Sequence, residues 1–93
     1  MSFKVSSDAL DPNRLKDQLS ADAAGACACF EGWVRNHNKG ESVLALEYEA
    51  HEGLAVKEGE KILAEAIEKF DLHAAAAEHR TGKLDIGDCA VWV

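Results

Sequence analysis

An amphipathic stretch over residues 53–70 constrains the fold of this chain more than any other feature. Apolar residues recur along it at helical spacing: Val56, Ile62, Leu63, Ala66, Ile67 and Phe70. Gly59 weakens such a helix by about 1 kcal/mol relative to alanine, so packing must hold the helix in place. Because the chain has only 93 residues, this helix and its neighbouring strands predict a single small domain over residues 1–93.

Two strand patterns precede that helix. Residues 23–35 predict a strand, and residues 36–40 form a polar, glycine-closed turn after it. Residues 42–50 then alternate as a half-buried strand does, with these apolar residues on one face: Leu44, Leu46 and Tyr48. The short turn between the two strands predicts a β-hairpin.

The rest of the chain predicts one short helix and two more strands. The Asp-Pro pair at residues 11–12 indicates the start of a helix over residues 12–19. Residues 73–80 and 88–93 are predicted as strands, with turns at 81–82 and 86–88.

Cysteine usage predicts buried, inert thiols. Cys27 and Cys29 lie two residues apart, so a regular strand places them on one face, where they are poorly placed to bridge one another. Cys89 has apolar neighbours on one side and Asp88 on the other, which gives no cause for a lowered pKa. Unbridged thiols, with no apolar run near ~20 residues and no signal-like pattern at the start, lead us to expect a cytoplasmic protein.

The charge balance argues against nucleic acid as the main partner. The net charge is −7, and residues 41–71 carry nine acidic residues against three lysines. Binding to a phosphate backbone requires a basic face instead. The acidic region permits a basic protein partner or a solvated helix.

The turn after residues 23–35 is the exception to this acidity. It gathers Arg35, His37, Lys39 and two asparagines at the end of a predicted strand. Cations and amide donors on such a loop are what an anionic ligand needs, and the Arg35 guanidinium can bind phosphate or carboxylate through two donors. Composition leaves an ordinary solvated turn, in which Asn and Gly serve turn geometry, equally open.

Other site chemistries have little support. Cys27 and Cys29 have C-x-C spacing and no two histidines have ligand spacing, so no metal site is predicted. The pair His51-Glu52 resembles the start of a metalloprotease motif, but Ala55 stands where the second histidine is required. Strand alternation places the carboxylates of residues 42–50 in solvent rather than in a catalytic pair.

Two motifs carry a resemblance to a known family. Residues 25–38 read GACACFEGWVRNHN and contain an F-x-G-x-V-R-N-H-N core, and residues 79–88 read HRTGKLDIGD and fit H-R-x-G-x-L-x-x-G-D. With residues 42–50 and the helix over residues 55–70, these segments cover most of the chain in one order. In this arrangement the sequence resembles the large subunit of molybdopterin synthase, the MoaE family.

The resemblance implies an α+β, hammerhead-type domain with antiparallel strands and one main amphipathic helix. It implies a homodimer in which each subunit binds a small ubiquitin-like sulfur carrier, giving a heterotetramer. The carrier's C-terminal Gly-Gly bears a thiocarboxylate, and two sulfurs are transferred to cyclic pyranopterin monophosphate to form the molybdopterin dithiolene of molybdenum cofactor biosynthesis. No cofactor or metal is implied for this subunit.

The same resemblance assigns a substrate-binding role to three residues. Arg35 matches the family's residue in the pocket for the pterin phosphate, and Val34 and Trp33 match neighbouring pocket positions. This agrees with the choice of Arg35 as an anion-binding residue on composition alone.

The resemblance also predicts what these 93 residues lack. The family's His-Arg pair and catalytic lysines match positions beyond Val93, so no catalytic residue is assigned. A lysine is needed to attack or position the thiocarboxylate carbonyl, and the lysines of the 53–70 helix are unsuited to replace it: Lys57, Lys61 and Lys69. We therefore expect a C-terminally truncated domain that is inactive on its own.

Two other interpretations stay open. The chain could be a non-catalytic dimerisation or carrier-binding module derived from that family, or an unrelated small α+β domain. The sequence encoded after Val93 distinguishes the first of these from an enzyme.

Overall fold

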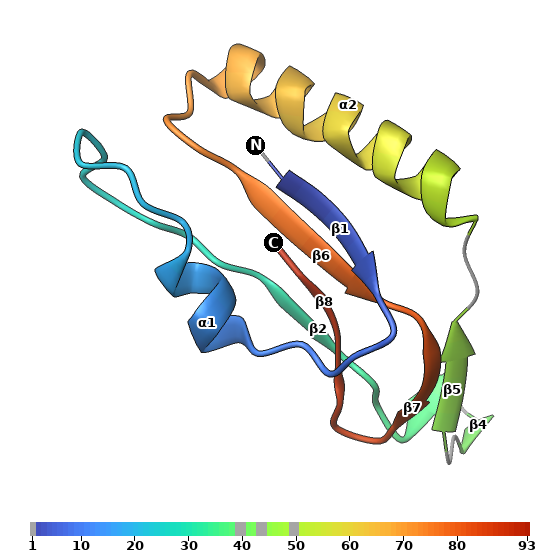
Figure 1. The fold of residues 1–93 in the computed structure, drawn as a ribbon. Coiled ribbons are helices and arrows are strands. Elements are labelled where there is room, and N and C mark those ends of the chain that lie inside the picture. The colour runs from blue at the N-terminus through green and yellow to red at the C-terminus, as the bar shows by residue number, and fades with distance from the viewer. Residues whose placement is uncertain (1, 39–40, 43–44, 49–50) are drawn as a thin grey trace.

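Figure 1 shows the fold in a computed structural model, which describes residues 2–38, 41–42, 45–48 and 51–93. The elements are β1 (Ser2–Ser6), α1 (Pro12–Asp17), β2 (Glu31–Trp33), β3 (His37–Asn38), β4 (Glu41–Ser42), β5 (Ala45–Tyr48), α2 (Glu52–Phe70), β6 (Ala76–Arg80), β7 (Gly82–Asp85) and β8 (Cys89–Trp92). One main helix against a mixed sheet confirms the expected α+β class.

The main sheet has the strand order β1-β6-β8-β2. β1 runs parallel to β6, whereas β6–β8 and β8–β2 are antiparallel. β1 was not predicted from the sequence, although Phe3 and Val5 alternate with polar residues in it. Two smaller ladders, β3–β4 and β5–β7, complete the described strands.

The predicted hairpin between residues 23–35 and 42–50 is wrong. β2 pairs with β8, and β5 pairs with β7, while the short strands β3 and β4 pair with each other. Alternation identifies a strand but not its partner, which is set by packing between distant segments. The predicted alternation of Leu44, Leu46 and Tyr48 lies outside the residues whose side chains are described.

The predicted strand over residues 23–35 is also shorter than expected. Phe30 and Val93 exchange backbone hydrogen bonds of 2.7 and 2.9 Å. The strand β2 begins only at Glu31, and residues 23–29 form no strand. A strand exists only where a neighbour completes its hydrogen bonds.

The main helix α2 begins and ends where its capping groups dictate. His51 is the N-cap, and its Nδ1 accepts a hydrogen bond of 3.2 Å from the Leu54 amide. His51 thus caps the helix, a structural role that the incomplete metalloprotease motif at residues 51–52 did not suggest. Asp71 ends the helix in the left-handed region at φ 52°, and its amide donates to the Ile67 carbonyl.

The apolar stripe of α2 is narrower than predicted along its middle and is not packed at its end. Leu63 is buried and Val56 and Ile67 are half-buried, as expected, but Ile62 is 62% exposed. Phe70, predicted on the same stripe, is instead 64% exposed, with the Lys69 ammonium 5.4 Å from its ring centre. The reason is visible in Figure 1, where the last turns of α2 run past the start of β6.

The two helices cover opposite faces of the sheet. Phe3 contacts Gly59 of α2, whereas Lys4, the next residue of β1, lines a cavity with Leu15 of α1. Successive strand residues point to opposite faces, so this pair of contacts fixes the layering. No helix within the described residues is long and apolar enough to span a membrane.

Gly59 provides the closest approach between α2 and the sheet. A Cβ at this position would lie 2.3–2.5 Å from the atoms of the Phe3 ring, whereas a Cβ at Gly53 would meet nothing closer than His51 at 3.9 Å. We expect Gly59→Ala to lower the free energy of unfolding by up to about 2 kcal/mol. Overpacking against Phe3 costs about 1–3 kcal/mol, whereas the gain in helix propensity is about 1 kcal/mol.

Urea denaturation measures this change, with Gly53→Ala as the matched control in the same helix. The control receives only the gain in helix propensity and is expected to be neutral or stabilising. Equal effects of the two substitutions would show that Phe3 does not pack against Gly59.

Candidate functional site

The end of β2, which leads into the predicted anion site, is held by a turn that is distant in the sequence. The Val34 amide donates to the Asp88 carbonyl at 3.0 Å, and the Gly87 amide donates to the Val34 carbonyl at 2.8 Å. The predicted turn at 86–88 is therefore confirmed, and Gly87 has the positive φ of 87° that such a turn requires. Both hydrogen-bonding groups of the Val34 backbone are thus held by the turn between β7 and β8.

A second set of contacts makes that turn rigid. The Asp88 carboxylate accepts hydrogen bonds from Arg80 Nη1 at 3.1 Å and from the Asp85 amide at 2.9 Å. The Arg80–Asp88 pair is part-buried and joins the end of β6 to the start of β8. The motif over residues 79–88 is therefore a structural clamp, and the motif over residues 25–38 docks on it through Val34.

Arg35 emerges from this junction into solvent. It directly follows the anchored Val34, and its side chain is exposed. On the next two residues, the Asn36 side-chain oxygen lies 3.0 Å from His37 Nδ1. Lys39, also predicted in this cluster, lies outside the described residues. An exposed guanidinium on a fixed backbone can bind a phosphate through two donors.

The three residues assigned to substrate binding occupy different surroundings. Trp33 is 66% exposed, and its indole N–H donates to the Glu31 carboxylate at 3.1 Å. Val34 is only 3% exposed and packs in a small core with Leu84 and Ala90. The structure therefore brings Trp33 and Arg35 to the surface, whereas the Val34 side chain anchors the strand between them.

The prediction of buried cysteines at 27 and 29 is wrong. Both thiols are exposed, with their sulfurs 3.7 Å apart, in a segment that forms no strand in the described structure. The pKa of the Cys29 thiol is raised, by desolvation first and then by Cys27. Cys89 is half-buried. Its burial, and next the negative charge of the Glu31 carboxylate, raise the pKa of the Cys89 thiol, as expected for an unreactive thiol.

Two charged residues were not singled out in the sequence. Arg80 has a buried Nε with no hydrogen-bond partner among the described residues, and its place in the 79–88 motif was the available signal. Glu78 is buried on β6, which no sequence pattern indicated. No group of three His, Cys, Asp or Glu residues in the described part of the chain could hold a metal ion.

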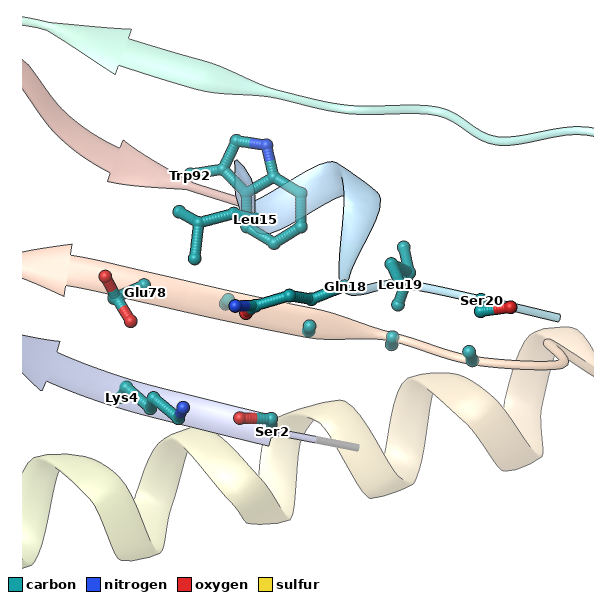
Figure 2. Close-up of a pocket in the computed structure, with 12 residues that line it drawn as sticks. Ser2, Lys4, Leu15, Gln18, Leu19, Ser20, Glu78 and Trp92 are labelled. Atoms are coloured by element: carbon teal, nitrogen blue, oxygen red, sulfur yellow. The ribbon is translucent and has the colours of Figure 1, made fainter. Parts of the chain in front are cut away.

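Two cavities lie away from Arg35. One, of about 680 Å³, is lined mainly by residues 21–28 and 71–76. The other, of about 290 Å³, lies between α1 and the main sheet, where Figure 2 shows Trp92, Leu15 and Glu78 around it. Arg35 lines neither of these two cavities, and its side chain is exposed.

Proteins from several organisms align with most of this sequence. The MoaE protein family matches residues 5–93. The molybdopterin synthase catalytic subunit of Bacillus subtilis is 37% identical over 89 residues, which is 96% of this chain and 57% of that protein. The corresponding subunit of Dictyostelium discoideum is 35% identical over 93 residues, which is 98% of this chain and 59% of that protein.

Solved structures agree with these relatives. Molybdopterin synthase from Staphylococcus aureus superposes with a TM-score of 0.89 at 31% identity, covering 97% of this chain and 66% of that one. Molybdopterin cofactor biosynthesis protein E from Burkholderia multivorans gives 0.84 at 38% identity, covering 98% and 60%. The chain thus spans less than two thirds of these proteins. By sequence and by fold, it belongs to the MoaE family.

Proposed function

We propose that this chain supplies the phosphate-binding part of a molybdopterin synthase catalytic subunit, in molybdenum cofactor biosynthesis. In this role the Arg35 guanidinium binds the phosphate of cyclic pyranopterin monophosphate. The exposed indole of Trp33, one residue before Val34, offers an aromatic surface beside it.

The docking of Val34 between Gly87 and Asp88 carries this proposal. Two backbone hydrogen bonds and a buried side chain fix the residue directly before Arg35. A preorganised backbone lowers the entropy lost when a ligand is bound. The Arg80–Asp88 clamp extends that rigidity to β6.

The sulfur-transfer step requires groups that we do not assign to these 93 residues. Attack on a thiocarboxylate carbonyl, or its positioning, calls for a lysine with access to the substrate. The lysines of α2 (Lys57, Lys61 and Lys69) are exposed on a helix that packs against β1, away from the junction that holds Arg35. A small sulfur-carrier subunit, a second copy of this subunit and a cytoplasmic location are parts of the same proposal.

A reconstitution tests the proposal. The isolated chain, mixed with thiocarboxylated carrier and cyclic pyranopterin monophosphate, is expected to retain the pterin in equilibrium dialysis but to form no molybdopterin, scored by fluorescence of its oxidised product. The catalytic subunit from Bacillus subtilis is the positive control.

Product formation at a rate near that of the control would overturn the assignment of chemistry to groups outside this chain. Failure to retain the pterin would overturn the binding role. Retention of the carrier without the pterin would favour the non-catalytic carrier-binding module instead.

A further inference from the structure

Cys27 and Cys29 form a pair of exposed thiols that contact each other. Their sulfurs lie 3.7 Å apart, close enough for one thiol to donate a hydrogen bond to the other. Both belong to residues 23–29, which form no strand in the described structure. The argument from the sequence against a bridge between them assumed a regular strand, so it does not apply to the observed conformation.

A short movement would join the two sulfurs. The sulfur–sulfur bond of a disulfide is about 2.0 Å long, so the two sulfurs have to approach each other by less than about 2 Å. Because residues 23–29 belong to none of the described strands, their backbone can adjust together with the side chains. A bridge across one intervening residue closes a small, strained ring, and strained or exposed disulfides are readily reduced again. The geometry therefore favours a bridge that forms and breaks over a permanent one.

The surroundings give the two thiols different roles. Cys27 lines the cavity of about 680 Å³ together with residues 71–76, whereas Cys29 does not line it. A small molecule that enters this cavity therefore reaches Cys27 first. The pKa of the Cys29 thiol is raised, by desolvation first and then by Cys27, so Cys29 stays protonated and is the weaker initial nucleophile.

Cys89 provides a reference thiol in the same chain. It is half-buried, and its Sγ donates a hydrogen bond of 3.4 Å to the Val91 carbonyl. It does not line the cavity beside Cys27, and burial raises the pKa of its thiol. Because thiol–disulfide exchange requires an accessible thiolate, Cys89 is expected to react more slowly than the pair.

We propose that Cys27 and Cys29 form a reversible dithiol–disulfide site that exchanges with small-molecule disulfides. The Cys27 thiolate attacks one sulfur of the small disulfide, whose sulfur–sulfur bond breaks, and the first small thiol leaves after taking up a proton. Cys29 then loses its proton and attacks the Cys27 sulfur of this mixed disulfide. The bond between Cys27 and Cys29 forms, and the second small thiol leaves. The pair is thereby oxidised by two electrons, and the small disulfide is reduced to two thiols. This site does not depend on the proposed function.

Oxidised glutathione is the probe that tests the site. The reduced chain is incubated with it at a fixed concentration of reduced glutathione, and the remaining free thiols are blocked with N-ethylmaleimide in denaturant. Trypsin then separates the pair, on residues 17–35, from Cys89, on residues 84–93. Mass spectrometry is expected to show that the first peptide has lost two hydrogen atoms and carries no maleimide, whereas the second carries one. Excess reduced glutathione is expected to reverse the change.

Single substitutions separate a bridge from ordinary thiol modification. Cys29→Ser is expected to stop at a mixed disulfide on Cys27. The native pair is expected to be half-oxidised at a ratio of oxidised to reduced glutathione about tenfold or more below the ratio that half-modifies Cys29→Ser, because the second step occurs within one chain. Cys89→Ser is the matched control and is expected to leave the native ratio within about twofold.

Three results would contradict this account. Mixed disulfides that accumulate on the native pair without a bridge would overturn the proposal, and so would oxidation of Cys89 at the same ratio as the pair. Equal rates of mixed-disulfide formation in Cys27→Ser and Cys29→Ser would overturn the assignment of Cys27 as the first nucleophile.

Discussion

Leu84→Ala is expected to lower the free energy of unfolding by about 2–5 kcal/mol, a large share of the stability of a small domain. Leu84 has no exposed surface and packs with Val34 and Ala90 at the junction of β2, β7 and β8. Removing three buried carbons loses their transfer free energy and leaves a cavity. The flanking strands cannot move in to fill that cavity, because the hydrogen bonds between Val34 and the 87–88 turn fix their separation.

Urea denaturation followed by circular dichroism measures this loss. Ile86→Ala is the matched control, because Ile86 is a similar aliphatic residue two positions along the chain that is 42% exposed. The control is expected to cost less than about 1 kcal/mol. Comparable losses in the two variants would show that the small core around Leu84 does not hold the site in place.

Arg35→Ala is expected to weaken binding of cyclic pyranopterin monophosphate by about 1.5–3 kcal/mol, or about 10–150-fold in Kd. This is the range for a hydrogen bond to a charged group, and here the guanidinium is replaced without disturbing the buried Val34 before it. Isothermal titration calorimetry on the chain measures the change directly.

Two variants control for the loss of charge. Arg14→Ala removes the same charge from an exposed position on α1 and is expected to leave Kd within about twofold. Arg35→Lys keeps the charge but not the two-donor geometry, and an intermediate Kd is expected. If Arg14→Ala and Arg35→Ala weakened binding equally, the effect would be one of net charge alone.

Local patterns in the sequence predicted local structure well. The periodicity over residues 53–70 located α2 to within one residue, and Asp11 and Pro12 located the start of α1, where the Asp11 carboxylate accepts from the Arg14 amide. Both signals depend on residues within two helical turns of each other. Phe70 was placed wrongly because its exposure depends on where the sheet ends rather than on the helix itself.

Pairing between distant segments was not predictable in the same way. The alternation of apolar and polar residues located β5 within residues 42–50, but it did not indicate that β5 pairs with β7. The exposure of Cys27 and Cys29 has a similar origin, since both residues precede the segment that pairs with β8. In each case the decisive contact joins residues that no local pattern connects.

The same distinction between local patterns and long-range contacts applies to the candidate site. Arg35 was identified as an anion-binding residue from its charge, and the family resemblance identified the pterin phosphate as the expected anion. The anchoring of Val34 by Gly87 and Asp88 could not be anticipated, although both segments had been recognised as separate motifs. The structure shows why the two motifs occur together: one docks on the other.

A calorimetric cycle tests the central claim, that Arg35 binds the phosphate of the pterin, most directly. The native chain and Arg35→Ala are each titrated with cyclic pyranopterin monophosphate and with the same pterin lacking its phosphate. The native chain is expected to prefer the phosphorylated ligand at least tenfold, and Arg35→Ala to bind both ligands equally. An undiminished preference in Arg35→Ala would contradict the assignment of Arg35 as the phosphate-binding residue.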